Sequence, residues 1–147
     1  MRKRLLIALG VVVFLVVAFG LARYLTTENT ERNAIAALLA AQGRGDANAM
    51  LAELDGSCRT EARCRSTVAA DARRLRRRGT PKIISLQSGT AYALGEATGT
   101  TRVAWTAVDE GLPVVQCVVV RRGGSALAGR TVTLLRISAP IGNESSC

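Results

Sequence analysis

The chain has 147 residues, a length that suits one domain of ordinary size. It carries a formal net charge of +9 and contains no histidine. The absence of histidine excludes a Ser-His-Asp or Cys-His catalytic site and any histidine-ligated metal. Aromatic residues make up 3% of the sequence, which argues against the stacking platforms that bind single-stranded nucleic acid.

A long apolar run stands near the start of the sequence. Leu5–Ala22 holds 16 apolar residues in 18, and residues 2–4 are Arg-Lys-Arg. Eighteen helical residues span about 27 Å, close to the roughly 30 Å hydrocarbon core of a bilayer. Because basic residues favour the cytoplasmic side, we expect residues 1–26 to form a cytoplasmic tip and a single transmembrane anchor, with residues 27–147 outside the cytoplasm. The alternative is a cleaved signal peptide, which would release a secreted domain.

All four cysteines lie beyond the apolar run. In an oxidising compartment an even number predicts two disulfides, with three possible connectivities. We expect Cys58–Cys64 as a local bridge and Cys117–Cys147 as the bridge that closes a longer loop. A four-cysteine zinc site is the alternative, which the lack of any C-x2-C pair disfavours. The sequence therefore predicts neither a metal nor another cofactor.

The first part of the outer domain has helical periodicity. Residues 28–42 carry apolar side chains at the i, i+3, i+4 spacing, with Thr27 or Asn29 as a cap and a Gly-Arg-Gly sequence at the end. Asp46 is suited to cap a second short helix, which Gly56 would close. A third helix is expected over residues 60–79, with Pro81 beyond it.

Beyond this proline the apolar period changes from 3.6 to 2, which indicates strands. The expected strands cover residues 82–87, 90–97, 101–108, 114–121 and 130–138. The fourth is apolar almost throughout, which predicts a central position. The element order predicts an α+β fold in which an N-terminal transmembrane helix precedes about three helices packed on a curved antiparallel sheet of four to five strands.

The beginning of the outer domain resembles a known superfamily. Ala34–Ala41, the Gly45-Asp46 turn and the short helix Met50–Leu54 are similar to the start of NTF2-like (cystatin-like) domains, of which membrane-anchored bacterial members exist. The resemblance covers roughly residues 28–138. It implies a cone that holds a small apolar ligand and a sheet that forms homodimers. The family often has strand structure where this chain has its first cysteine pair, which implies a shortened or closed cone.

Arginines concentrate at the end of the third expected helix. They are Arg73, Arg74, Arg76, Arg77 and Arg78. Such a cluster is suited to contact anionic headgroups, wall polymers or phosphates. The alternative is an ordinary solvated helix end, because 18 of the 20 basic residues are arginine, as in proteins from GC-rich genomes. Without the three cations at positions 2–4 the net charge is +6.

The strands offer little for acid–base catalysis. Glu96 and Tyr92 would support a small-molecule lyase or isomerase if both pointed into the cone, whereas Asp109 and Glu110 have the pattern of turn residues. We therefore expect a non-catalytic binding or scaffolding module anchored in the bacterial cell membrane, whose partner is an envelope protein or a small apolar ligand. The alternatives are the lyase or isomerase and an anion-binding envelope protein that uses the arginine cluster.

Overall fold

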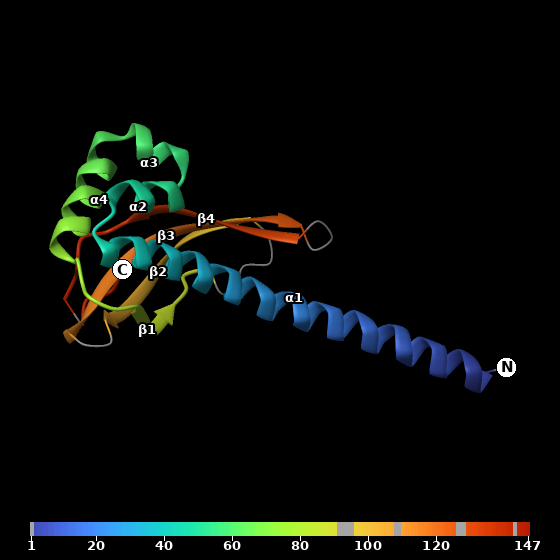
Figure 1. The fold of residues 1–147 in the computed structure, drawn as a ribbon. Helices are drawn as coiled ribbons and strands as arrows, with labels where there is room; N and C mark the ends of the chain where they lie inside the picture. The colour runs from blue at the N-terminus through green and yellow to red at the C-terminus, as the bar shows by residue number, and fades with distance from the viewer. Residues whose placement is uncertain (1, 91–95, 108–109, 126–128, 143) are drawn as a thin grey trace.

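The computed structural model describes residues 2–90, 96–107, 110–125, 129–142 and 144–147. Figure 1 shows its helices and strands, and the order of the strands in the sheet is β1-β2-β3-β4 with every neighbouring pair antiparallel. The elements are α1 (Arg2–Arg44), α2 (Ala47–Glu53), α3 (Gly56–Thr60), α4 (Ala62–Arg74), β1 (Pro81–Gln87), β2 (Ala97–Ala107), β3 (Glu110–Ser125) and β4 (Gly129–Ile137). The predicted α+β class is confirmed.

The helix α1 runs without interruption from the apolar run into the domain (Figure 1). The prediction of a separate helix capped by Thr27 or Asn29 is wrong, because no proline or glycine interrupts α1 there. Among the residues described, no helix meets the length and apolarity required of a membrane span. The transmembrane anchor is therefore not confirmed.

The C-terminal half of α1 packs into the core. Ile35, Leu38 and Leu39 are fully buried, as their helical spacing predicts. The helix ends where Gly45 adopts a φ of 76°, a conformation that glycine reaches at little cost. Asp46 then caps α2 through its carboxylate, which accepts a hydrogen bond of 2.9 Å from the backbone N–H of Ala49.

The region between α2 and α4 differs from the expectation. Gly56 begins α3 instead of closing α2, because the carboxylate of Asp55 accepts a hydrogen bond from the backbone N–H of Ser57 and caps this short helix. The third expected helix is shorter than residues 60–79, since α4 begins at Ala62 and ends at Arg74. Residues 76–78 therefore lie beyond the helix.

The sheet has four strands in the described part of the chain. Of the strand expected over residues 90–97, residues 91–95 lie outside the described residues, and Ala97 begins β2. Of the turn expected at Asp109–Gly111, Asp109 is not described and the other two residues belong to β3. Residues 122–129 lie between two of the expected strands and were therefore expected as a loop, but residues 122–125 extend β3. The predicted inner position of this apolar strand is confirmed, because β3 lies between β2 and β4.

The core lies between the helices and one face of the sheet. Trp105 of β2 is fully buried there, opposite Leu38 of α1 and Met50 of α2 in one apolar cluster. The inward face of β2 and β3 follows a strand period of two, so residues at alternate positions reach this cluster. The other face of the sheet, which we call the outward face, bears Thr100, Arg102 and other residues of opposite parity.

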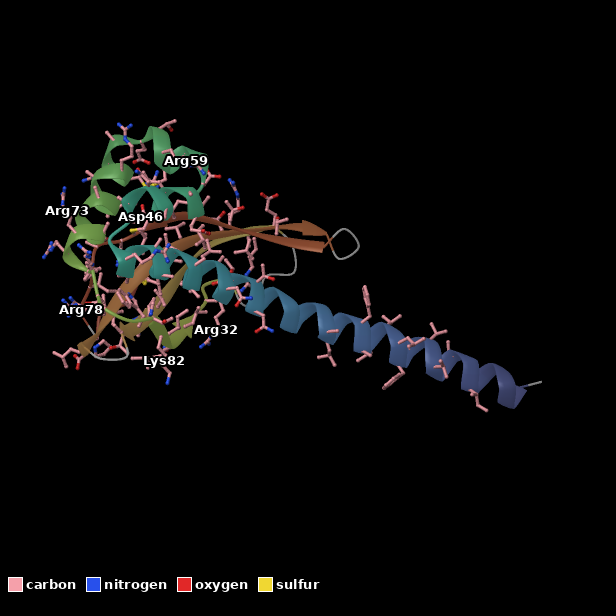
Figure 2. All side chains as sticks on the ribbon, in the orientation of Figure 1. Arg32, Asp46, Arg59, Arg73, Arg78 and Lys82 are labelled. Carbon is pink, nitrogen blue, oxygen red and sulfur yellow. A yellow bond between two sulfur atoms is a disulfide. The ribbon has the colours of Figure 1, made fainter. Side chains whose placement is uncertain are left out.

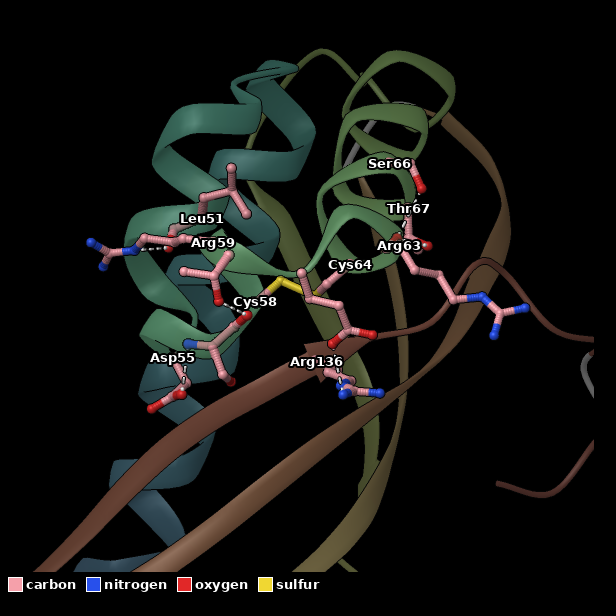
Figure 3. The surroundings of a disulfide bond; sticks show 12 residues. Leu51, Asp55, Cys58, Arg59, Arg63, Cys64, Ser66, Thr67 and Arg136 are labelled. Atoms are coloured by element: carbon pink, nitrogen blue, oxygen red, sulfur yellow. Dashed lines mark hydrogen bonds and ion pairs between the residues drawn. A yellow bond between two sulfur atoms is a disulfide. The ribbon is translucent and has the colours of Figure 1, made fainter.

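Both expected disulfides are present. Cys58–Cys64 joins α3 to α4 with a Cα–Cα distance of 5.2 Å (Figure 3), and Cys117–Cys147 fixes the C-terminal segment to the outward face of β3 with a Cα–Cα distance of 5.8 Å. Arg102 also holds this segment, because its Nε donates to the backbone oxygen of Ser145 at 3.1 Å. The described residues contain no free cysteine.

The two disulfides are expected to differ in their effect on stability. In the chain-entropy model, loss of the Cys117–Cys147 loop of sequence separation 30 costs about 3.5 kcal/mol, and loss of the Cys58–Cys64 loop of separation 6 costs about 2 kcal/mol. Denaturant unfolding of the two Cys→Ser double variants, in the full chain, measures both values. The reverse order of stability would contradict the entropic explanation.

Candidate functional site

The predicted arginine cluster lies at the end of the domain where α1 and α4 both finish (Figure 2). Arg73 and Arg74 occupy the last turn of α4, and Arg76–Arg78 follow in the connection to β1. The backbone N–H of Arg77 donates to the backbone oxygen of Gly43 at 2.9 Å. The structure thus brings the five arginines together around the C-terminal end of α1, although only the first two are helical.

Further cations extend this cluster. We define the distal basic surface as the exposed side chains of Arg44, Arg73, Arg74, Arg76, Arg78 and Lys82. Figure 2 shows Arg73, Arg78 and Lys82 at the end of the molecule opposite the N-terminus. The remaining member of the predicted cluster, Arg77, is half-buried. Lys82 follows the predicted cluster directly in the sequence, whereas Arg44 was not predicted, because only the fold brings the end of α1 beside the segment that follows α4.

A buried polar network lies behind this surface. The side-chain oxygen of Gln116 accepts hydrogen bonds from Trp105 Nε1 at 2.9 Å and Gln42 Nε2 at 3.0 Å. Its amide nitrogen donates to Asp71 Oδ2 at 3.3 Å and to the backbone oxygen of Ser138 at 2.9 Å. The network therefore links α1, α4 and the two inner strands, and it fixes the orientation of the only tryptophan.

Asp71 is the titratable member of this network. Burial raises its pKa to about 6, while the positive charge of Arg74 acts in the opposite direction. The side-chain oxygen of Gln42 is buried and has no hydrogen-bond partner among the described residues. The sequence signal for this network is Gln42, a polar residue at a position of the otherwise apolar helix face.

A second buried network joins α1 to the sheet. Glu31 is fully buried and Arg122 is 3% exposed, and they form an ion pair in which Arg122 Nε donates to Glu31 Oε2 at 2.9 Å and Nη2 contacts the same oxygen. Thr101 Oγ1 donates to Glu31 Oε1 at 2.5 Å, and Ser88 Oγ donates to Oε2 at 3.2 Å. Arg122 Nη1 donates to the backbone oxygen of Thr90 at 3.1 Å. Both charges are thus compensated inside the core.

Sequence reasoning missed this ion pair. Its two residues are 91 positions apart, and Arg122 was expected in a loop. A signal did exist, because the strand period of two places Arg122 on the same face as Gln116, Val118 and Val120, which are all buried. Its geometry suits a structural connection, since both oxygens of Glu31 are occupied by hydrogen bonds.

The structure describes only one of the two residues expected for a catalytic cone. Glu96 is exposed to solvent, and Tyr92 lies outside the described residues. A hollow of about 420 Å³ does open on the outward face, between the end of β1, Thr100, Arg102 and the C-terminal segment held by Cys147. Its lining residues include Gln87, Ser88 and Glu144, and it lies on the face of the sheet that points away from the helices, not in the interior where the NTF2-like resemblance implies a ligand site.

Comparisons with family models, curated proteins and solved structures yield no match to this chain. The NTF2-like resemblance therefore stays a prediction.

Breaking the buried ion pair is expected to destabilise the fold strongly. Glu31→Ala leaves Arg122 buried without its counter-charge, which costs about 3–5 kcal/mol in the free energy of unfolding. Replacing both residues by apolar ones, Glu31→Leu with Arg122→Met, is expected to recover much of that loss. Arg121→Ala is the matched control, because its 3.4 Å pair with Asp55 is exposed and worth at most about 1 kcal/mol. An equal cost for Glu31→Ala and Arg121→Ala would contradict this prediction.

The raised pKa of Asp71 predicts a pH dependence of stability. Between about pH 4 and pH 6 the folded state binds the proton more tightly than the unfolded state, so the free energy of unfolding falls as the pH rises through this window. A shift of about two units corresponds to about 3 kcal/mol. Asp71→Asn is expected to remove this slope, measured by denaturant unfolding followed through Trp105 fluorescence. Asp46→Asn, at an exposed helix cap, serves as the control that keeps the slope.

Proposed function

We propose that the chain is a membrane-anchored, extracytoplasmic binding or scaffolding module without catalytic activity, which presents its α+β domain on a rigid helix. The observation that carries this proposal is the unbroken α1, whose apolar N-terminal half is continuous with a helix packed into a disulfide-bonded domain. The two disulfides support an oxidising, extracytoplasmic location for the domain.

The apolar half of α1 supports the anchoring. The large apolar side chains described there are 52–70% exposed, and they include Ile7, Val13 and Phe19, which lie about 120° apart around the helix axis. A helix that is apolar on all sides is typical of a membrane span, because exposure of this surface to water is unfavourable and the lipid chains of a bilayer cover it. The basic residues at positions 2–4 favour a cytoplasmic N-terminus.

The packing of the interior supports a binding role over an enzymatic one. Trp105, Leu38 and Met50 are fully buried between the helices and the sheet, so they fill the region where the NTF2-like resemblance predicts a ligand. A partner would then dock on the surface. A homodimer through the sheet would have to avoid the part of the outward face that the segment ending at Cys147 occupies.

Membrane anchoring is tested by fractionation of cells that express the full chain. The wild type is expected in the membrane fraction, resistant to alkaline carbonate and released by detergent. Val13→Arg with Val16→Arg is expected to move the protein to the soluble fraction, because two charges at the centre of a span each cost about 2.5–3.5 kcal/mol. The matched control is Ala36→Arg with Ala37→Arg, at exposed positions of the same helix inside the domain. Recovery of the wild type in the soluble fraction would refute the anchor.

A further inference from the structure

The backbone that bears the distal basic surface is held in place by contacts with α1. Besides the Arg77–Gly43 hydrogen bond, the aliphatic stem of Arg76 packs on Gly45, where an added Cβ would lie 3.1 Å from Arg76 Cδ. The helix α4 is held in turn by the buried side chain of Val68 and by the disulfide of Cys64. These contacts therefore hold in place the backbone from which the cationic side chains project.

Their charge exceeds what the protein itself neutralises. The ion pairs found among the described residues engage the arginines at 121, 122 and 136, and none of the six cations of the distal basic surface. The C-terminal ends of α1 and α4 together contribute a partial charge of about −1. Among the side chains that the structure describes, Asp46 and the buried Asp71 are the neighbouring acids. Six positive charges thus face about three negative ones, which leaves a net positive field directed to solvent.

The membrane that would anchor the chain is too far away to neutralise this field. The apolar run ends at Ala22 and α1 ends at Arg44, so the helix places about 33 Å between them. A tilt of 40° still leaves about 25 Å. The headgroups extend about 5–7 Å beyond the hydrocarbon core, so they lie roughly two to three and a half Debye lengths of about 8 Å away at physiological ionic strength.

We infer that the distal basic surface docks a polymer with repeated backbone phosphates, located away from the anchoring membrane. This inference rests on the proposed function. Arginine binds phosphate through paired N–H donors, and five of the six cations are arginines. A polymer engages several of them at once, whereas a single small anion engages one or two. Recognition of backbone phosphates needs no aromatic side chains, in agreement with the composition of the chain.

The test measures binding of labelled long-chain polyphosphate and of poly(glycerol phosphate) to the full chain in nanodiscs of neutral lipid. Binding of either is expected to weaken steeply with salt, and the one that binds tighter identifies the kind of polymer. The triple variant Arg73→Gln, Arg76→Gln, Arg78→Gln is expected to lose at least tenfold in affinity. Its log–log salt slope is expected to fall by about 2, since each phosphate contact to a flexible strand contributes about 0.7.

The matched control is the triple variant Arg59→Gln, Arg63→Gln, Arg65→Gln, which removes the same charge from exposed positions of α3 and α4 outside this surface. An equal loss in both triple variants would overturn the inference, and so would equally tight binding of poly-L-glutamate. Replacing the neutral lipid by phosphatidylglycerol is expected to leave polymer binding unchanged. Competition by that lipid would show that the surface reaches its own bilayer. Because fractionation tests the anchor separately, failure of either proposal is distinguishable from failure of the other.

Discussion

The buried ion pair between Glu31 and Arg122 is the constraint on which the arrangement of the molecule depends. It lies where α1 leaves the domain, and it ties the helix to β3 through charges that water does not reach. Buried charges tolerate little displacement, because each loses its compensation when the other moves. The apolar contacts of Leu38 hold the same helix further along. The ion pair and these apolar contacts therefore fix the C-terminal half of α1 to the domain.

Local patterns accounted for most elements of the fold. The apolar spacing around Leu38 and Leu39 and the cap at Asp46 depend on neighbours a few residues away, and the sequence contains those neighbours. The cysteine pairing also followed, since four thiols allow few connectivities. The continuity of α1 did not, because a change from apolar to polar composition was interpreted as a break. A change in side-chain polarity does not by itself break a helix, because helical hydrogen bonds join backbone groups.

The functional surfaces were less accessible to sequence reasoning. The arginine cluster was visible because its members lie within six positions of the sequence, but the addition of Arg44 depends on the path of the backbone around the end of α1. The pair of Glu31 and Arg122 depends on strand register, which no local pattern determines over such a separation. Long-range polar contacts in general leave only one trace in a sequence, a polar residue on an otherwise apolar face.

The unbroken α1 has a consequence for direction as well as for distance. Each residue of an α-helix turns the chain by about 100° and advances it by about 1.5 Å. The number of residues between Ala22 and Glu31 therefore sets the angle, measured around the axis of α1, at which the arginines lie relative to the apolar half of the helix. One inserted residue would rotate the arginines by about 100° around the helix axis and move them by only about 1.5 Å along it. An insertion of 18 residues would restore the original angle, with the arginines five helical turns further from the apolar half. The same stretch of helix thus determines both the distance and the angle of the arginines relative to the apolar half of α1.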